Sequence, residues 1–361
     1  MTGCRHESRH RVQSFRNEFR KSDFVSPACG TWCIITGRAY KAGLRGQLSS
    51  NVRPQNRHPL GSMAHQTPEV NEPLVRALIA EQFPQWAGLS VKAVSEGGWD
   101  NRTFLVGSEL LARLPSGADY EPQVHREQRW LPHLRALLPL EIPEPLALGQ
   151  PGHGFPWVWS VYRWIPGATS SSSPPTDKRQ FAVDLAAFLS ALHRVPAEDG
   201  PAPGEENFFR GGDLVVYDQQ FQQAVASTAS KVDTAAALAV WKAALASSWS
   251  GPPVWVHGDI SLGNLLVRQG RLAAVIDFGQ LCAGDPACDL AIAWTYFRGE
   301  DRNTFLHRLA VDPGTQARGC AWALWKAVIV AAGLAQTNAG EGQVAWQTID
   351  EILASQRRAE A

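Results

Sequence analysis

Residues 255–290, WVHGDISLGNLLVRQGRLAAVIDFGQLCAGDPACDL, decide the fold of this chain. Three polar residues stand out in these otherwise apolar surroundings: Asp259, Asn264 and Asp277. Short apolar runs typical of β-strands flank them, at 254–256, 265–267 and 273–276. The segment 268–271 has the length of a hairpin turn and a glycine suited to positive φ. We therefore predict that two carboxylates and one amide converge at one end of a small sheet.

Phosphoryl transfer needs a set of this kind, because its chemistry consists mainly of positioning and charge neutralisation. Asp259 is expected to accept the proton of a substrate hydroxyl. The amide oxygen of Asn264 and the carboxylate of Asp277 are expected to hold Mg²⁺ against the phosphates of a nucleotide. The alternative is that all three are ordinary turn residues, but a turn has no need of this order and spacing.

The pattern resembles the catalytic loop and the metal-binding Asp-Phe-Gly of protein kinases, with His-Gly-Asp in place of His-Arg-Asp. His-Gly-Asp-x4-Asn, Ile-Asp-Phe-Gly and Gly-Asp-Pro-x2-Asp-Leu-Ala, in this order, are similar to the signature of the aminoglycoside phosphotransferase family. That family also includes macrolide, choline and homoserine kinases. The resemblance covers about residues 70–340. It implies that ATP or GTP, with Mg²⁺, phosphorylates a hydroxyl of a small molecule, first of all an aminoglycoside-type antibiotic.

Two neighbours of the motif are expected to support the catalytic residues. His257 is predicted to orient the loop by hydrogen bonding, because the adjacent Asp259 is the better placed base. Asp289 opens an apolar helical run, so it is predicted either to cap that helix or to brace the catalytic loop.

The region before the motif predicts a helix at 71–83, capped by Asn71, and then an antiparallel sheet. The expected strands are 91–95, 103–106, 110–114, 146–148 and 157–164. Gly97 and Gly98 lie in the first turn of this sheet. In a kinase-like lobe that turn covers the nucleotide phosphates, where glycines let backbone N–H groups approach the oxygens. An ordinary hairpin turn is the alternative.

Arg113 lies on the third strand, where the kinase pattern expects a lysine that contacts the α- and β-phosphates. Arginine also binds phosphate, although its fork differs in geometry from an ammonium. Its partner is predicted to be Glu127, on the amphipathic helix that follows, with Glu121 as the alternative.

The aromatic strand 157–164 leads to a hinge. By the resemblance, the backbone of this hinge hydrogen-bonds the nucleobase, through Arg163, Trp164 and Ile165. An edge strand with core tryptophans is the other interpretation. Helices are predicted beyond the hinge: one capped by Thr176 and ending near 193, others within 214–249, and two at about 315–338 and 343–356. The resemblance implies that these later helices shape the acceptor pocket.

The predicted fold is therefore α+β and protein-kinase-like, with two lobes. Residues 63–164 form an antiparallel N-terminal lobe that binds the nucleotide, and residues 165–361 form a mainly helical lobe that is catalytic and binds the substrate. The basic stretch 1–62 is expected to be disordered. It could be a transit peptide or a nucleic-acid-binding arm, but the simpler interpretation is sequence upstream of a natural start at Met63.

The composition is typical of a globular, soluble protein. The 361 residues are 44% apolar, with 34 basic and 34 acidic side chains. The stretch 1–62 carries eleven basic and three acidic residues, which leaves 23 basic and 31 acidic for the rest. No run of eighteen apolar residues and no secretory signal is present, so we expect a cytoplasmic protein without membrane or nucleic-acid partners, monomeric or homodimeric. The six cysteines show no disulfide spacing, and Cys29-x3-Cys33 is too loose for a metal site.

Three functions remain open on the sequence: an antibiotic kinase, a metabolic kinase acting on a small alcohol such as choline or homoserine, and a non-catalytic pseudokinase. The intact polar triad argues against the last. Three acidic residues downstream could meet a polyamine substrate: Asp285, Glu300 and Asp301. Solvated surface charge is the alternative for the last two.

Overall fold

The computed structural model describes residues 69–94, 100–335 and 339–360. Contacts divide the chain into Met1–Met63 and Ala64–Ala361, and every described residue belongs to the second unit. The extension 1–62 and the glycine pair, Gly97 and Gly98, lie outside the described residues.

The first lobe is built on a five-stranded antiparallel sheet within the described residues, in the order β1-β2-β3-β5-β4. Its strands are β1 (Val91–Ala93), β2 (Asn101–Val106), β3 (Leu110–Pro115), β4 (Pro145–Gly149) and β5 (Trp159–Arg163). Each of the five strands predicted from the sequence is present. Its helices are α1 (Glu72–Gln82), η1 (Pro84–Trp86), η2 (Ala118–Tyr120) and α2 (Glu121–Arg135). Asn71 caps α1 as predicted, accepting a hydrogen bond from the N–H of Leu74 at 3.1 Å.

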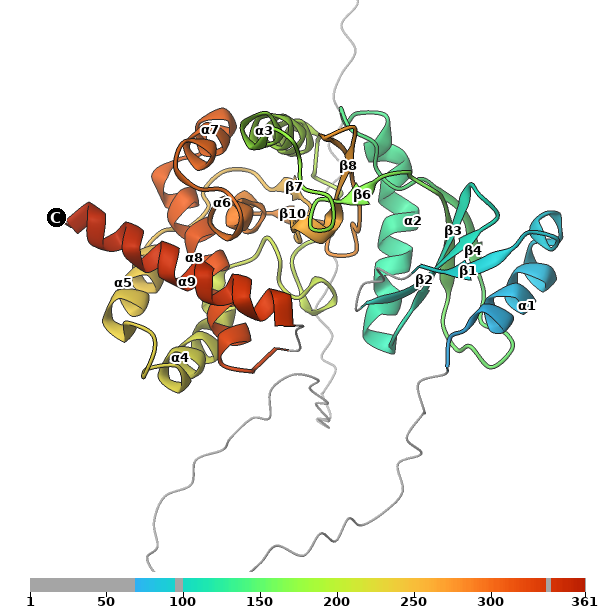
Figure 1. The fold of residues 1–361 in the computed structure, drawn as a ribbon, viewed down its shortest axis with the longest axis horizontal. Coiled ribbons are helices and arrows are strands. Elements are labelled where there is room, and N and C mark those ends of the chain that lie inside the picture. Colours follow the sequence, from blue (N-terminus) through green and yellow to red (C-terminus); the bar gives the residue numbers. More distant parts are fainter. Residues whose placement is uncertain (1–68, 95–99, 336–338, 361) are drawn as a thin grey trace, which may run out of the picture. The chain divides into compact units, whose positions relative to one another are not determined.

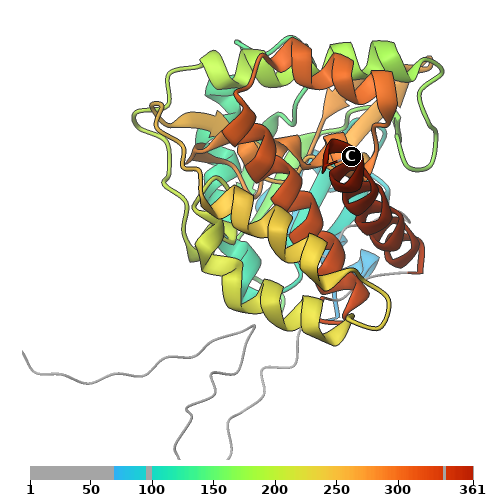
Figure 2. The same cartoon turned by 90° about the vertical axis from the view of Figure 1, so that its left-hand side faces the viewer.

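The second lobe is mainly helical (Figure 1). Its α-helices are α3 (Lys178–Arg194), α4 (Asp218–Ser227), α5 (Thr234–Leu245), α6 (Ile292–Thr295), α7 (Gly299–Leu309), α8 (Pro313–Ala331) and α9 (Ala339–Glu360). Its 3₁₀ turns are η3 (Glu205–Asn207), η4 (Leu214–Tyr217), η5 (Leu262–Asn264) and η6 (Pro286–Ala291). Helices α3 and α7 lie side by side, as Figure 2 shows.

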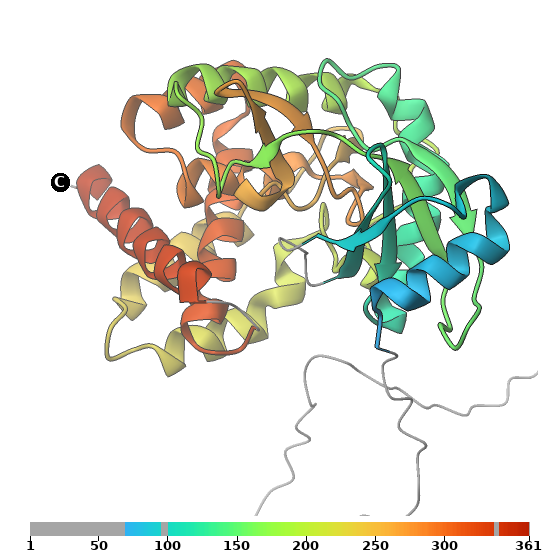
Figure 3. The same ribbon diagram turned by 45° about the vertical axis from the view of Figure 1, so that its right-hand side comes forward.

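Residues 255–290, which hold the predicted catalytic residues, form the catalytic segment. Short strands accompany it: β6 (Ala168–Thr169), β7 (Val254–Val256), β8 (Leu265–Arg268), β9 (Arg271–Val275) and β10 (Cys282–Gly284). Figure 3 shows β6 beside the β8–β9 hairpin, with which it forms a three-stranded sheet. The hairpin turn has positive φ at both central residues, Gln269 at 52° and Gly270 at 76°, as its length predicts.

Two details of the prediction are wrong. The three apolar runs do not share one sheet, because β7 pairs with β10, whose three residues were too short to be recognised as a strand. The cap of α3 is Asp177, not Thr176. The side chain of Asp177 accepts from the N–H of Gln180 at 3.0 Å, whereas Thr176 contacts the hairpin glycine Gly270.

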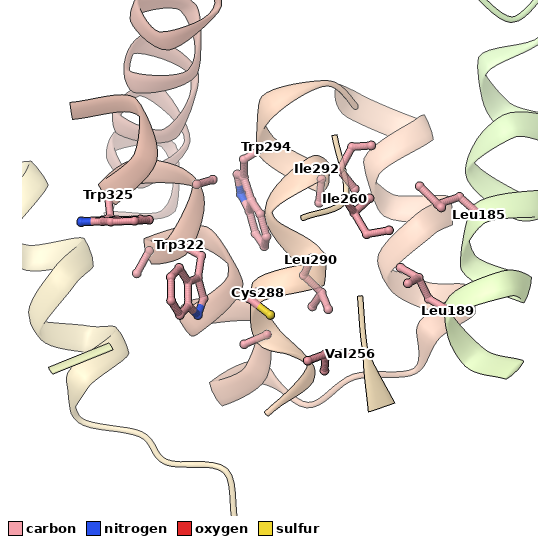
Figure 4. Packing of buried hydrophobic residues seen from close by; sticks show 14 of the residues in the cluster. Leu185, Leu189, Val256, Ile260, Cys288, Leu290, Ile292, Trp294, Trp322 and Trp325 are labelled. Carbon is pink, nitrogen blue, oxygen red and sulfur yellow. The ribbon is translucent and has the colours of Figure 1, made fainter. Parts of the chain in front are cut away.

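The core has two parts. The smaller packs α1 against the sheet, with Val75, Leu78 and Ile79 fully buried. The larger fills the helical lobe, where residues of α3 point toward the catalytic segment in Figure 4. Helix α2 reaches into this second core, because Trp130 packs edge-on against Trp255 of β7 at 4.9 Å between ring centres. The catalytic segment is thus held from both lobes.

Candidate active site

The catalytic loop follows β7 and is braced from behind by a buried carboxylate. The two oxygens of Asp289 accept hydrogen bonds from the backbone N–H groups of His257 and Gly258, each at 2.8 Å. Asp289 lies inside η6, which Asp285 caps, so of its two predicted roles the brace is right and the cap is wrong. Gly258 has φ of 86°, and a Cβ there would meet the carbonyl oxygen of Gln280 at 2.7 Å. The loop therefore requires the glycine of His-Gly-Asp.

His257 fixes the orientation of the loop, as predicted. Its Nδ1 accepts from the N–H of Asp259 at 3.2 Å, and its Nε2 lies 3.0 Å from the carbonyl oxygen of Ile276. The imidazole therefore ties the segment before Asp259 to the end of β9, which carries Asp277.

Asp259, Asn264 and Asp277 come together at the ends of β7 and β9. The Asn264 amide nitrogen donates to the backbone oxygen of Asp259 at 2.9 Å and to its Oδ2 at 3.0 Å. The backbone N–H of Ile276 donates to the carbonyl oxygen of Asn264, which places the amide beside Asp277. Asp277 has φ of 67°, the left-handed region that few non-glycine residues adopt and that recurs at functional sites.

Arg113 joins the sheet to this catalytic segment. Its Nη1 lies 3.1 Å from both oxygens of Glu127, and its Nη2 lies 3.0 Å from Oδ1 of Asp277. The predicted pair with Glu127 is therefore present. The alternative partner, Glu121, instead accepts from the backbone N–H of Val158.

Glu127 is the centre of a buried network. Its side chain is 3% exposed, and it accepts from the backbone N–H of Phe278 at 2.9 Å and from the hydroxyl of Tyr162. Burial lowers the pKa of Arg113, but the charges of Glu127 and Asp277 outweigh it and hold that pKa well above its usual value. The guanidinium therefore stays charged beside the site.

Asp100 is a third carboxylate at the site that the sequence analysis did not identify. Burial raises its pKa to about 6, and the charges of Asp277 and Asp259 act in the same direction, opposed by a hydrogen bond from Gln123. In the sequence it lies two residues after Gly98, the second of the two glycines, and this position is the signal that could have found it.

The donor set fits a magnesium ion. The amide nitrogen of Asn264 is committed to Asp259, which leaves the amide oxygen of Asn264 and the carboxylate of Asp277 as hard oxygen ligands. In the described part of the chain no group of three His, Cys, Asp or Glu residues is arranged to hold a metal. Magnesium does not need one, because it is usually held by one or two protein carboxylates together with phosphates and waters.

The predicted hinge keeps part of its backbone occupied. The N–H of Arg163 donates to the carbonyl oxygen of Glu144 at 3.0 Å, and that of Trp164 donates to the carbonyl oxygen of Glu109 at 2.7 Å. Of the three predicted hinge N–H groups, that of Ile165 is the one with no backbone acceptor within the described chain.

Two cationic residues that the sequence analysis missed lie near Asp259, the predicted base. The ammonium of Lys326 on α8 lies 3.4 Å from Oδ1 of Asp259. The base of the Arg210 side chain packs at Gly258, where a Cβ would lie 3.1 Å from Cβ of Arg210. Partial burial raises the pKa of Asp259, but Lys326, Arg210 and His257 lower it by more, so the net direction is down.

A sequence signal for Lys326 existed. It is the only charged residue in the apolar run 320–334, and the only exposed residue among 321–329. Arg210 gave no comparable signal, because it lies in an irregular segment between η3 and η4.

Two of the three acidic residues predicted to meet a polyamine pair with arginines of this chain. Asp285 is buried and pairs with Arg318 at 2.7 Å. Asp301 pairs with Arg179 of α3 at 3.6 Å, and Glu300 precedes it in the first turn of α7. Asp285 is thus a structural ion pair rather than a substrate contact.

The fold is two-lobed, α+β and kinase-like, and it brings Asp259, Asn264 and Asp277 together in the arrangement that the kinase-like pattern predicts. The sequence model of the phosphotransferase enzyme family matches residues 90–324, well over half of the chain. The chain belongs to this family, and it is a phosphotransferase that takes a hydroxyl group as acceptor. Within the described residues, no helix combines the length and the apolar character needed to cross a membrane.

The chain is similar to several known proteins. The uncharacterized protein YcbJ of Bacillus subtilis is 26% identical over 238 residues, 60% of this chain and 71% of that protein. An aminoglycoside 3'-phosphotransferase of Salmonella typhimurium is 31% identical over 144 residues, 38% of this chain and about half, 52%, of that protein. The solved GDP and kanamycin complex of APH(2")-IIia superposes with a TM-score of 0.58 at 18% identity, over 80% of this chain and 99% of that chain. This last likeness supports the kinase-like fold.

Proposed function

We propose that this chain transfers the γ-phosphoryl group of ATP or GTP to a hydroxyl of a small molecule, with Asp259 as the catalytic base. The observation that carries the proposal is the convergence of Asp259, Asn264 and Asp277, with Arg113 donating to Asp277 at 3.0 Å. A non-catalytic nucleotide-binding protein has no need to keep all of these contacts.

In this mechanism Asp259 holds the acceptor hydroxyl and takes its proton as the oxygen bonds to the γ-phosphorus. The bond from that phosphorus to the bridging oxygen breaks, so a phosphate ester and a nucleoside diphosphate leave. Asn264 and Asp277 would hold Mg²⁺, which neutralises charge on the phosphates when bound. Arg113 lies beside Asp277, where it can bind the α- and β-phosphates, and Glu127 keeps its guanidinium in place.

The remaining proposed nucleotide contacts are divided between the two lobes. We propose that the lobe of residues 63–164 binds the nucleotide through Gly97 and Gly98 over the phosphates, and that the hinge backbone contacts the base through Ile165. The lobe of residues 165–361 then carries the catalytic loop and the acceptor. The proposed contact between the hinge and the base is supported by the backbone N–H of Ile165, which has no backbone acceptor within the described residues.

The relatives favour an aminoglycoside-type acceptor, since this chain aligns with about half of an aminoglycoside 3'-phosphotransferase of Salmonella typhimurium. Choline, homoserine and macrolide acceptors are the alternatives. The side chains that face Asp259 favour a different acceptor class, because they are cationic.

The test is nucleotide consumption by the full chain with Mg²⁺, over a panel of kanamycin, erythromycin, choline, homoserine and hydroxy acids. We expect turnover with at least one of these compounds, none with casein, and loss of turnover in Asp259→Asn. Phosphorylation of casein alone, or failure to bind Mg²⁺-nucleotide, would contradict the proposed function.

A further inference from the structure

The charge on the acceptor side of Asp259 is the feature that identifies the acceptor. Two cations lie near Asp259: the ammonium of Lys326 is 3.4 Å from its Oδ1, and the side chain of Arg210 begins beside the neighbouring Gly258. The second oxygen of this carboxylate is already engaged by Asn264 at 3.0 Å. Helix α8 carries Lys326 and also the two tryptophans that the Arg210 guanidinium covers, so both cations lie on the α8 side of the site.

Lys326 is not an ordinary surface lysine. From Ala321 to Ile329 helix α8 is buried everywhere except at this residue, whose side chain is 51% exposed. A helix that is apolar all round would exclude a charge here unless the position opened onto solvent or a ligand. The opening is shared with Asp259, whose side chain is 35% exposed.

Arg210 is fixed so that its charge stays near the loop. Its backbone oxygen accepts from the amide of Asn207 at 3.0 Å and from the thiol of Cys282. Its guanidinium lies over the rings of Trp322 and Trp325, 5.2 and 5.1 Å from their centres. These two indoles, labelled in Figure 4, are nearly perpendicular to each other. Cation–π contacts orient a guanidinium without cancelling its charge.

No ion pair with a described residue neutralises Arg210. Two acidic residues of the neighbouring elements accept hydrogen bonds from neutral donors: Asp213 from the N–H of Val215 at 3.0 Å, and Asp218 from the side chains of Trp241 and Gln222. Within the described residues, Asp259 is the one carboxylate that forms an ion pair with either Lys326 or Arg210, so both charges can repel a further cation or attract an anion.

We propose that the acceptor of this enzyme is a hydroxyl compound that carries an anionic group, a carboxylate or a phosphate, bound by Lys326 and Arg210. A polycationic aminoglycoside is not its substrate. The proposal rests on the proposed function for the position of the acceptor hydroxyl. The anionic group replaces part of the contact between Lys326 and Asp259 and leaves the base free for the hydroxyl.

The test uses acceptors that share a carbon skeleton and differ in charge. The full chain, with Mg²⁺ and a non-hydrolysable ATP analogue at saturating concentration, is titrated calorimetrically with gluconate, glucitol and glucamine. A second set is glucose 6-phosphate, glucose and glucosamine, which separates a phosphate from a carboxylate. The analogue fills the γ-phosphate position, so an anion that binds must occupy the acceptor side.

We expect at least one anion to bind about 10- to 100-fold more tightly than its neutral partner, the range for hydrogen bonds to charged groups, and the cation to bind most weakly. Lys326→Gln and Arg210→Gln should each remove most of that advantage. Lys242→Gln, which removes a charge from an exposed site on α5, is the matched control and should keep it.

Equal binding within both sets, preference for an amine, or no binding of either anion overturns the inference. The titrations are run whether or not the nucleotide analogue binds. Failure of the analogue itself contradicts the proposed function, whereas a bound analogue with no preference for anions contradicts the acceptor class alone.

Discussion

The two sides of the site are built differently. On the nucleotide side, Arg113 is 12% exposed and Glu127 is 3% exposed, and the pair is tied to Asp277, to Tyr162 and to the backbone of Phe278. On the acceptor side, Lys326 is half exposed and holds Asp259 by one contact of 3.4 Å. The contacts of Arg113 and Glu127 on the proposed nucleotide side are thus fixed before any ligand arrives, while Lys326 on the proposed acceptor side can move. Phosphoryl transfer requires side chains that are held rigidly in position. Selection among acceptors can instead use exposed side chains that differ from one family member to another.

The largest effect is expected for Asp259, where a substitution should lower kcat without changing nucleotide affinity. Asp259→Asn removes the base but keeps an oxygen for the hydrogen bond from Asn264. We expect kcat to fall about 10²- to 10⁴-fold, the range for losing a general base, with Mg²⁺-nucleotide affinity unchanged by calorimetry. Loss of nucleotide binding in this variant would show that the two sides are not separate.

The reciprocal change lies on the nucleotide side. Asp277→Asn keeps a residue type that tolerates the left-handed backbone at this position, but it removes the charged metal ligand. Nucleotide affinity in the presence of Mg²⁺ should fall by about 10- to 100-fold, as for disturbed metal sites. Without Mg²⁺ the variant and the parent should bind alike. An equal loss without the metal would mean that Asp277 does not act through a cation.

A smaller effect concerns stability. Glu127→Gln weakens a buried ion pair, although the glutamine can still accept a hydrogen bond from the N–H of Phe278. The free energy of unfolding, measured by urea denaturation, should therefore fall by about 1–3 kcal/mol. Lys326→Gln is the matched change on the acceptor side, and its exposed position predicts a loss of under about 1 kcal/mol. If the two variants lost the same stability, the contrast between a fixed and an adaptable side would be wrong.

The smallest expected effect is at the hinge. The Arg163 side chain is 52% exposed and pairs with Glu144, while the proposed base contact uses backbone only. Arg163→Ala should therefore leave the Kd of the nucleotide within about twofold, the usual scale for an exposed ion pair. A tenfold loss by calorimetry would place the arginine side chain on the nucleotide.

The residues predicted from the sequence are those whose geometry is local. Asp259, Asn264 and Asp277 lie within one loop and one hairpin, so their spacing determines where they meet. Arg113 and Glu127 were predictable because a familiar strand–helix pattern positions them. Lys326 and Arg210 were missed because packing brings α8 and an irregular loop to the site, and no spacing in the sequence records that contact.

Other errors have equally local causes. Asp285 was read as a substrate contact, since nothing in the sequence reveals that Arg318 of α8 would reach it. Thr176 and Asp177 are both good capping residues, and the hydrogen bond of Thr176 to Gly270 decided between them. Strand β10 carries too few residues for alternation to be visible.

The contact between Arg113 and Asp277 joins residues 164 positions apart, and this separation affects how the chain folds. Closing so long a loop costs entropy before the contact returns any energy, so the nucleotide side forms late in folding. A bound nucleotide then links the unfolding of one lobe to that of the other. At about 100 times its Kd it adds roughly 2.7 kcal/mol to the stability of the native chain, and the two lobes should melt as one cooperative unit.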